Sequence, residues 1–205
     1  MSARRTSAAI FAAAVALTAG DAHLYAGANH FRDGRFQEAF VEFSVARQRG
    51  AGGEAAWYSA AALVKLGRAE DAVEEFADAE RLDPAGRDTL LDYYRALACY
   101  DARLYLCADQ LLAAVGAKAG PKVAGQANKL RGDLRALFAG TPATTAIDWY
   151  HLRGAAAVEA GRGALARAYY QEAIGLARLR PDKHREAEAR EALSAVKIPP
   201  SARAR

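Results

Sequence analysis

Apolar residues recur at helical spacing along most of the chain, and glycine or proline interrupts them at short intervals. In segments 54–66 and 69–82 the apolar positions follow one another three or four residues apart, which is typical of amphipathic helices. Gly67 separates the two segments, because glycine tolerates the left-handed conformation in which helices often end. Pro84 ends the second segment, since proline disfavours helical geometry in the residue before it. The pattern predicts a hairpin of two helices.

The hairpin contains a spaced set of small and aromatic residues that occurs three times. In each copy a glycine is followed, five, nine and twelve positions later, by an alanine, an aromatic residue and an alanine. The copies are Gly34, Ala39, Phe43 and Ala46; Gly67, Ala72, Phe76 and Ala79; and Gly161, Ala166, Tyr170 and Ala173. A degenerate copy has Ala102, Cys107, Leu111 and Ala114, with alanine in place of the turn glycine. The repetition predicts a repeat protein in which Gly34, Gly67 and Gly161 are structural turn residues.

The remaining helices follow from the same pattern and from the breaks between apolar stripes. The turns at 34, 67 and 102 lie 33 and 35 residues apart, whereas the next turn lies 59 residues further on. This longer interval predicts an insertion, and an apolar stripe from Val123 to Leu137 places an extra helix in it at about 121–139. The other predicted helices are 21–32, 36–49, a pair within 88–115, 148–160, 164–179 and 183–196, followed by a disordered tail at 197–205.

A period of 33 to 35 residues with paired helices, a mid-repeat glycine, and then small, aromatic and small residues resembles the tetratricopeptide repeat. The resemblance implies an all-α fold, a right-handed superhelical α-solenoid of antiparallel helix pairs with an inserted helix and a C-terminal capping helix. One pair cannot bury its own apolar face, so the pairs must stack. The repeats would cover about 20–52, 53–86, 87–117 and 147–180 of a domain at 21–180, with the cap at 181–196.

Members of this family are usually interaction scaffolds whose first helices line a concave groove. The resemblance places an aromatic groove surface with few cations on this chain, and Trp57, at one of its positions, is expected in the core. For Tyr25, Tyr58 and Tyr93 the alternative is packing against a neighbouring repeat. The chaperone-binding subset of the family grips a terminal carboxylate with a lysine and asparagine set that is absent here. The candidate partner-binding residues are Tyr25, Arg32, Tyr58, Lys65, Asp92, Tyr93 and His151.

The N-terminal segment 1–20 has the order of features expected of an export signal. Arg4 and Arg5 precede an uncharged apolar run at 8–19, and small residues follow, with cleavage expected after Gly20 or Ala22. The run is too short to span a bilayer comfortably, so no stable membrane insertion of the mature chain is expected. The segment predicts an exported protein, periplasmic or secreted. The alternative is a cytoplasmic protein whose alanine-rich N-terminus packs on the repeats.

Composition and chemistry narrow the function classes further. The 205 residues are 52% hydrophobic and 25% charged, which excludes wholesale disorder, and a net charge of +4 does not indicate a nucleic-acid partner. Cys99 and Cys107 fall near the end of one predicted helix and early in its partner. They are a candidate disulfide pair in an oxidising compartment, and small core residues otherwise. No histidine or cysteine has a convincing set of further ligands, so neither a metal nor another cofactor is expected.

Sequence motifs for catalysis are missing as well. The chain has no G-x-S-x-G, no H-E-x-x-H, and no phosphate-binding loop, since Pro121 stands where such a loop requires glycine. His151 and Glu159 lack a third catalytic partner. The sequence therefore predicts a non-catalytic scaffold or adaptor that binds a protein or peptide in an exported, cell-envelope assembly, with no small-molecule substrate. A cytoplasmic adaptor is the alternative, and an enzyme of unknown class the less favoured one.

Overall fold

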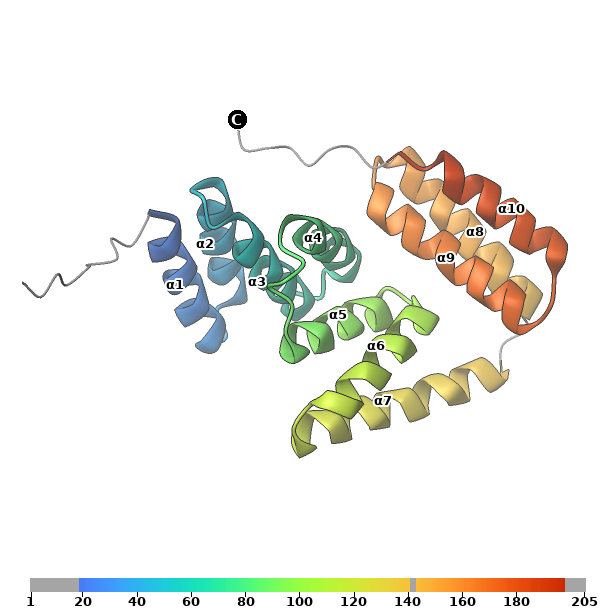
Figure 1. Ribbon diagram of the computed structural model, residues 1–205, viewed down its shortest axis with the longest axis horizontal. Helices are drawn as coiled ribbons and strands as arrows, with labels where there is room; N and C mark the ends of the chain where they lie inside the picture. The colour runs from blue at the N-terminus through green and yellow to red at the C-terminus, as the bar shows by residue number, and fades with distance from the viewer. Residues whose placement is uncertain (1–18, 141–142, 198–205) are drawn as a thin grey trace, which may run out of the picture.

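The computed structural model describes residues 19–140 and 143–197, which form ten α-helices and no strand. Neighbouring helices pack in pairs (Figure 1), so the predicted all-helical fold with paired helices is confirmed. The first three pairs are α1 (Ala19–Arg32) with α2 (Phe36–Gln48), α3 (Gly52–Lys65) with α4 (Ala69–Leu82), and α5 (Thr89–Asp101) with α6 (Tyr105–Lys118). Next come α7 (Pro121–Gly140), packed on α6, the pair α8 (Ala143–Glu159) and α9 (Gly163–Leu179), and α10 (Lys183–Ala195), packed on α9.

Two of the predicted segments fall largely outside the described residues. The export signal was placed at 1–20, of which the structure describes only the first two residues of α1. The tail was placed at 197–205, of which only Lys197 is described. Among the helices that the structure does describe, none combines the length and apolarity needed to cross a membrane.

The repeated small and aromatic positions form the contacts within the helix pairs. Phe43, Phe76 and Tyr170 are each at most 4% exposed, although each lies on the second helix of a different pair. The alanines five and twelve positions after the turn glycines are fully buried beside them. A side chain no larger than a methyl group at these positions lets two helix backbones approach closely, and the aromatic ring fills the remaining space.

Three of the four hairpin turns use glycine in the left-handed region, and the fourth uses arginine. Gly34, Gly67 and Gly161 have φ angles of 76°, 72° and 70°, and Arg103 has a φ of 62°. The sequence register that placed Ala102 at the third turn is therefore wrong by one residue. A small residue was expected at the turn, but the turn requires a positive φ, which a longer side chain can adopt at a modest cost.

The corrected register also identifies the buried positions of the third pair. The residues five, nine and twelve positions after Arg103 are Ala108, Leu112 and Val115, and all three are buried. The residues expected in these places, Cys107, Leu111 and Ala114, are only partly buried. The turns at 34, 67, 103 and 161 are thus 33, 36 and 58 residues apart.

Arg103→Gly is expected to have a free energy of unfolding about 0.5–1 kcal/mol higher than that of Arg103→Ala, because glycine adopts a positive φ without steric cost. Urea unfolding measures the change. Arg103→Ala is the matched control, since it removes the same side chain and keeps the backbone strain. Gly67→Ala should lose about 1 kcal/mol, although a Cβ at Gly67 has open space around it. Equal stabilities of Arg103→Gly and Arg103→Ala would contradict the strain at this turn.

The last helix pair docks on the second and third pairs through α9, which packs on both α4 and α6. Glu74 of α4 accepts a hydrogen bond from the backbone N–H of Leu165 at 2.7 Å, in the first turn of α9. Glu70 accepts from the Tyr169 hydroxyl at 2.8 Å and pairs with Arg162 at 2.9 Å. Carboxylates near a helix N-terminus satisfy its free N–H groups and its positive end charge. The acidic face of α4 therefore fixes where α9 begins.

Candidate binding cavity

Two of the predicted groove positions on the first helices are occupied by buried side chains. Trp57 is fully buried, as expected, and its indole N–H donates to the carbonyl oxygen of Asp83 at 2.9 Å. Asp92 is 8% exposed and pairs with Arg87 at 2.5 Å. Neither side chain is available to a partner.

Aromatic rings from α1, α2 and α5 meet around the end of α3. The rings of Phe31 in α1 and Tyr94 in α5 have their centroids 5.8 Å apart. The Lys65 ammonium nitrogen lies 5.4 Å from the centroid of Tyr94 and 5.8 Å from that of Phe36. Such distances allow cation–π attraction. The chain's own side chains therefore engage Lys65 and cover this part of the first-helix face.

The other predicted binding residues lie apart from one another, and they differ in burial and in the residues they contact. Tyr58 stacks on Phe43 with 5.6 Å between centroids, and Tyr93 is half-buried against the core. His151 packs edge-on against Tyr170 at 5.4 Å. Tyr25 is 71% exposed, and Arg32 is exposed and bonded to Asn29 of its own helix. The structure does not gather these residues into one site.

A cavity of about 660 Å³ lies between α6, α7, α8 and α9, and it contains none of the predicted binding residues. Leu134 and Leu137 line it from α7, Leu176 and Leu179 from α9, and Trp149 from α8. Leu134 and Leu176 are buried, whereas Leu137 is 45% and Leu179 68% exposed. The volume lies within the range of ligand-binding pockets in proteins. The walls therefore present leucine side chains to the solvent from two facing helices.

Three of the polar residues that line this cavity are arginines. Arg103, Arg135 and Arg180 line it, and none of the three pairs with a carboxylate in the described part of the chain. The guanidinium of Arg103 lies 5.9 Å from the centroid of Trp149. Asp109 also lines the cavity, but Arg131 engages its carboxylate at 2.8 Å. The cavity thus combines an apolar interior with an excess of positive charge.

Contacts from α8 and α9 to the α5–α6 turn hold one wall of the cavity in place. The Tyr150 hydroxyl donates to the carbonyl oxygen of Arg103 at 2.5 Å, and burial raises the pKa of this phenol well above its ordinary value. The hydroxyl therefore keeps its proton and remains a donor. Because Arg103 and Tyr150 both line the cavity, this bond fixes the turn against α8 at its edge.

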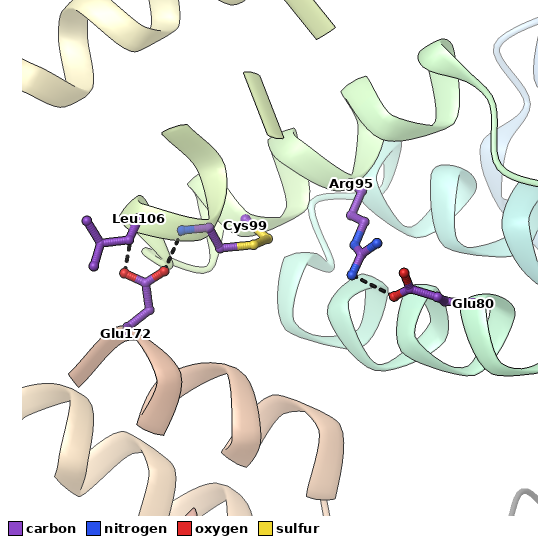
Figure 2. Close-up of a disulfide and its surroundings, with 6 residues drawn as sticks. Glu80, Arg95, Cys99, Leu106 and Glu172 are labelled. Carbon is purple, nitrogen blue, oxygen red and sulfur yellow. Dashed lines mark hydrogen bonds and ion pairs between the residues drawn. A yellow bond between two sulfur atoms is a disulfide. The ribbon is translucent and has the colours of Figure 1, made fainter. Parts of the chain in front are cut away.

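Figure 2 shows the second contact, in which Glu172 of α9 reaches the first turn of α6. Its carboxylate accepts hydrogen bonds from the backbone N–H of Leu106 at 2.9 Å and of Cys107 at 2.6 Å. The Glu172 side chain is buried, and this burial raises its pKa to about 7, although the two N–H groups lower it. Leu106 lines the cavity, so Glu172 positions part of the wall.

A disulfide joins Cys99 of α5 to Cys107 of α6, with the two Cα atoms 6.1 Å apart (Figure 2). The covalent bond ties α5 to the same turn of α6 that Glu172 caps. In the same view Arg95 of α5 pairs with Glu80 of α4 at 2.8 Å. The α6 wall is therefore connected both to the last helix pair and to the second one.

No metal-binding arrangement is found among the described residues, where no group of three or more histidine, cysteine, aspartate or glutamate side chains is placed to hold an ion. His23 instead lies 2.7 Å from a carboxylate oxygen of Glu42, which joins α1 to α2.

Searches of protein-family models, of curated proteins and of solved structures found no match to this chain. The resemblance to the tetratricopeptide repeat therefore depends on the spacing of the turn, small and aromatic residues, and it stays a prediction.

Proposed function

We propose that this protein is a non-catalytic scaffold that binds a segment of a protein partner, and that the partner docks in the cavity between α6, α7, α8 and α9. The observation that carries the proposal is the pair of exposed leucines, Leu137 and Leu179, on facing walls of that cavity. Exposed apolar side chains that line a concave surface are typical of interaction sites. The proposed site is therefore not the groove predicted on the first helices. It lies beside α7, the helix that interrupts the regular spacing of the repeats.

The chemistry of the lining favours binding over catalysis. Asp109 is the one carboxylate among the described lining residues, and Arg131 already engages it. The remaining polar groups are arginines, tyrosines and Thr145. The nearby carboxylate of Glu172 already accepts two backbone hydrogen bonds from α6. Leucine and tryptophan side chains on several walls instead provide contact area for apolar groups of a partner.

The proposal also includes the overall arrangement of the helix pairs and the cellular location of the protein. We propose that the pairs α1–α2, α3–α4 and α5–α6 stack as a right-handed superhelical solenoid of the tetratricopeptide type. Direct contacts of α2 with α3 and of α4 with α5 support this. The apolar segment at 8–19, after Arg4 and Arg5, supports export to a cell-envelope assembly, and a cytoplasmic adaptor is the second candidate.

A photo-crosslinking amino acid at Leu179 is expected to form an adduct with one partner protein in the source cell. The same amino acid at Val41 of α2, which is 50% exposed, is the matched control and should not capture this protein. The adduct should disappear when Leu137→Asp is introduced on the opposite wall, because a carboxylate there disrupts apolar contact. Equal capture from both positions, or an adduct that survives Leu137→Asp, would contradict docking in the cavity.

A further inference from the structure

We infer that the occupant of the α6–α9 cavity is an acidic amphipathic helix of the partner, with apolar side chains toward the leucines and carboxylates toward the arginines. This inference rests on the proposed function and adds the shape and charge of the docking segment. Three features carry it: the helical walls, the uncompensated arginines, and the charge of the chain's own terminal segments.

The walls of the cavity favour a helix over an extended peptide. Leu134 and Leu137 are three positions apart on α7, as are Leu176 and Leu179 on α9, so each helix presents one stripe of its surface. A helix packs between such stripes by placing its own side chains in the grooves beside them. One common way to bind an extended peptide is to pair it with the edge of a sheet, and the described residues form no strand. A helix in this cavity would therefore have the same kind of neighbours as a helix inside a helical bundle.

The arginines favour acidic side chains on that helix. Arg103 lies in the α5–α6 turn, Arg135 on α7, and Arg180 directly after α9, so positive charge reaches the cavity from three elements. A basic helix would place like charges together, which lowers affinity. An acidic helix would bring the carboxylates with which these arginines do not pair in the described part of the chain. The charge pattern therefore selects acidic helices and rejects basic ones.

The terminal segments of the chain are poor candidates for the same place. Residues 1–18 contain Arg4 and Arg5 and no acidic residue, and residues 198–205 contain Arg203 and Arg205 and no acidic residue. A second copy of the chain that docked through its own cavity would bring the same cationic rim. Charge complementarity thus favours a different protein as the source of the helix.

The inference can be tested with the full chain and two synthetic helical peptides. Both have the same leucine face, and their polar faces contain glutamate in one peptide and lysine in the other. Trp149 lines the cavity and serves as the fluorescent reporter, because the other tryptophan, Trp57, is fully buried in a different hairpin. At low salt the glutamate peptide is expected to bind about tenfold more tightly than the lysine peptide.

Charge reversal provides the matched variants. The double variant Arg135→Glu, Arg180→Glu should lose the preference for the glutamate peptide or reverse it. The double variant Arg32→Glu, Arg49→Glu makes the same change in net charge near α1 and α2 and should retain the preference. A stronger response to the lysine peptide, or a preference that both double variants alter equally, would overturn the inference.

The remaining outcomes separate this inference from the proposed function. If both peptides bind with equal affinity, the acidic helix is rejected while docking of a protein segment in the cavity is retained. If neither peptide changes Trp149 fluorescence but dodecanoate does, the site takes a small amphipathic carboxylate, and both proposals are overturned. If none of the three probes binds, both proposals are overturned as well.

Discussion

Replacing Trp57 by alanine is expected to lower the free energy of unfolding by about 3–5 kcal/mol. The indole is fully buried, and its centroid lies 5.9 Å from that of Phe76 on the paired helix. Its N–H also donates to the carbonyl of Asp83, the residue that follows α4. The substitution therefore leaves a large void between α3 and α4 and removes the donor that holds the end of α4.

Two further variants separate these contributions in urea unfolding followed by circular dichroism. Trp57→Phe keeps most of the ring and removes the N–H donor, so it should cost about 1–3 kcal/mol. Tyr25→Ala removes an aromatic side chain that is 71% exposed on α1, and it should change stability by less than about 0.5 kcal/mol. Equal losses for Trp57→Ala and Tyr25→Ala would mean that the indole is not a core residue.

The hairpins could be predicted from the sequence because their determinants are local. Three of the turns have a glycine with positive φ, and close packing of the two helices requires an alanine at a fixed distance after it. The spacing after Gly67 therefore identifies the same contacts after Gly34 and Gly161. The helix boundaries follow for the same reason. α4 ends one residue before Asp83, as the following Pro84 requires.

The third turn was misplaced because its register was set from a small turn residue and the positions that follow it, and the helix before the turn was not used. The residues seven positions before the four turns are all small: Gly27, Ala60, Ala96 and Gly154. A Cβ at Gly27 or Gly154 would come within 2.6 Å of the ring of Phe43 or Tyr170, so the paired helix limits the size of these residues. This spacing identifies Arg103 as the third turn without any requirement for glycine there. The small residue seven positions before each turn is therefore a more informative signal than a glycine at the turn.

The cavity could not be predicted, because it depends on where α9 docks. The unequal interval between turns indicates an insertion, but helical periodicity does not show which surface the following helices contact. Glu70 and Glu74 have the pattern of a solvated helix face in the sequence. In the structure they bind Arg162 and the first turn of α9, more than 85 positions further along the chain. Contacts at such separation leave no local pattern, so the walls of the cavity become apparent only in the fold.

The contribution of Glu172 to stability is expected to be lost as the pH rises from about 4.5 to above 7. Burial raises the pKa of this carboxyl from 4.5 to about 7. Between these values the folded protein holds a proton that the unfolded chain releases, so the folded state binds more protons and stability falls with rising pH. The contribution is fully present below pH 4.5. A pKa difference of this size corresponds to about 3 kcal/mol.

Urea unfolding of the wild-type protein and of Glu172→Gln, at several pH values between 4.5 and 8, tests this expectation. The glutamine amide does not titrate, and the other ionisable groups are common to both proteins, so the difference between their free energies of unfolding isolates the carboxyl. Wild-type stability should fall by about 3 kcal/mol relative to the variant over this range. Parallel curves would contradict the raised pKa: the carboxyl would then be hydrated in solution, or the hydrogen bonds from Leu106 and Cys107 would fully offset the cost of its burial.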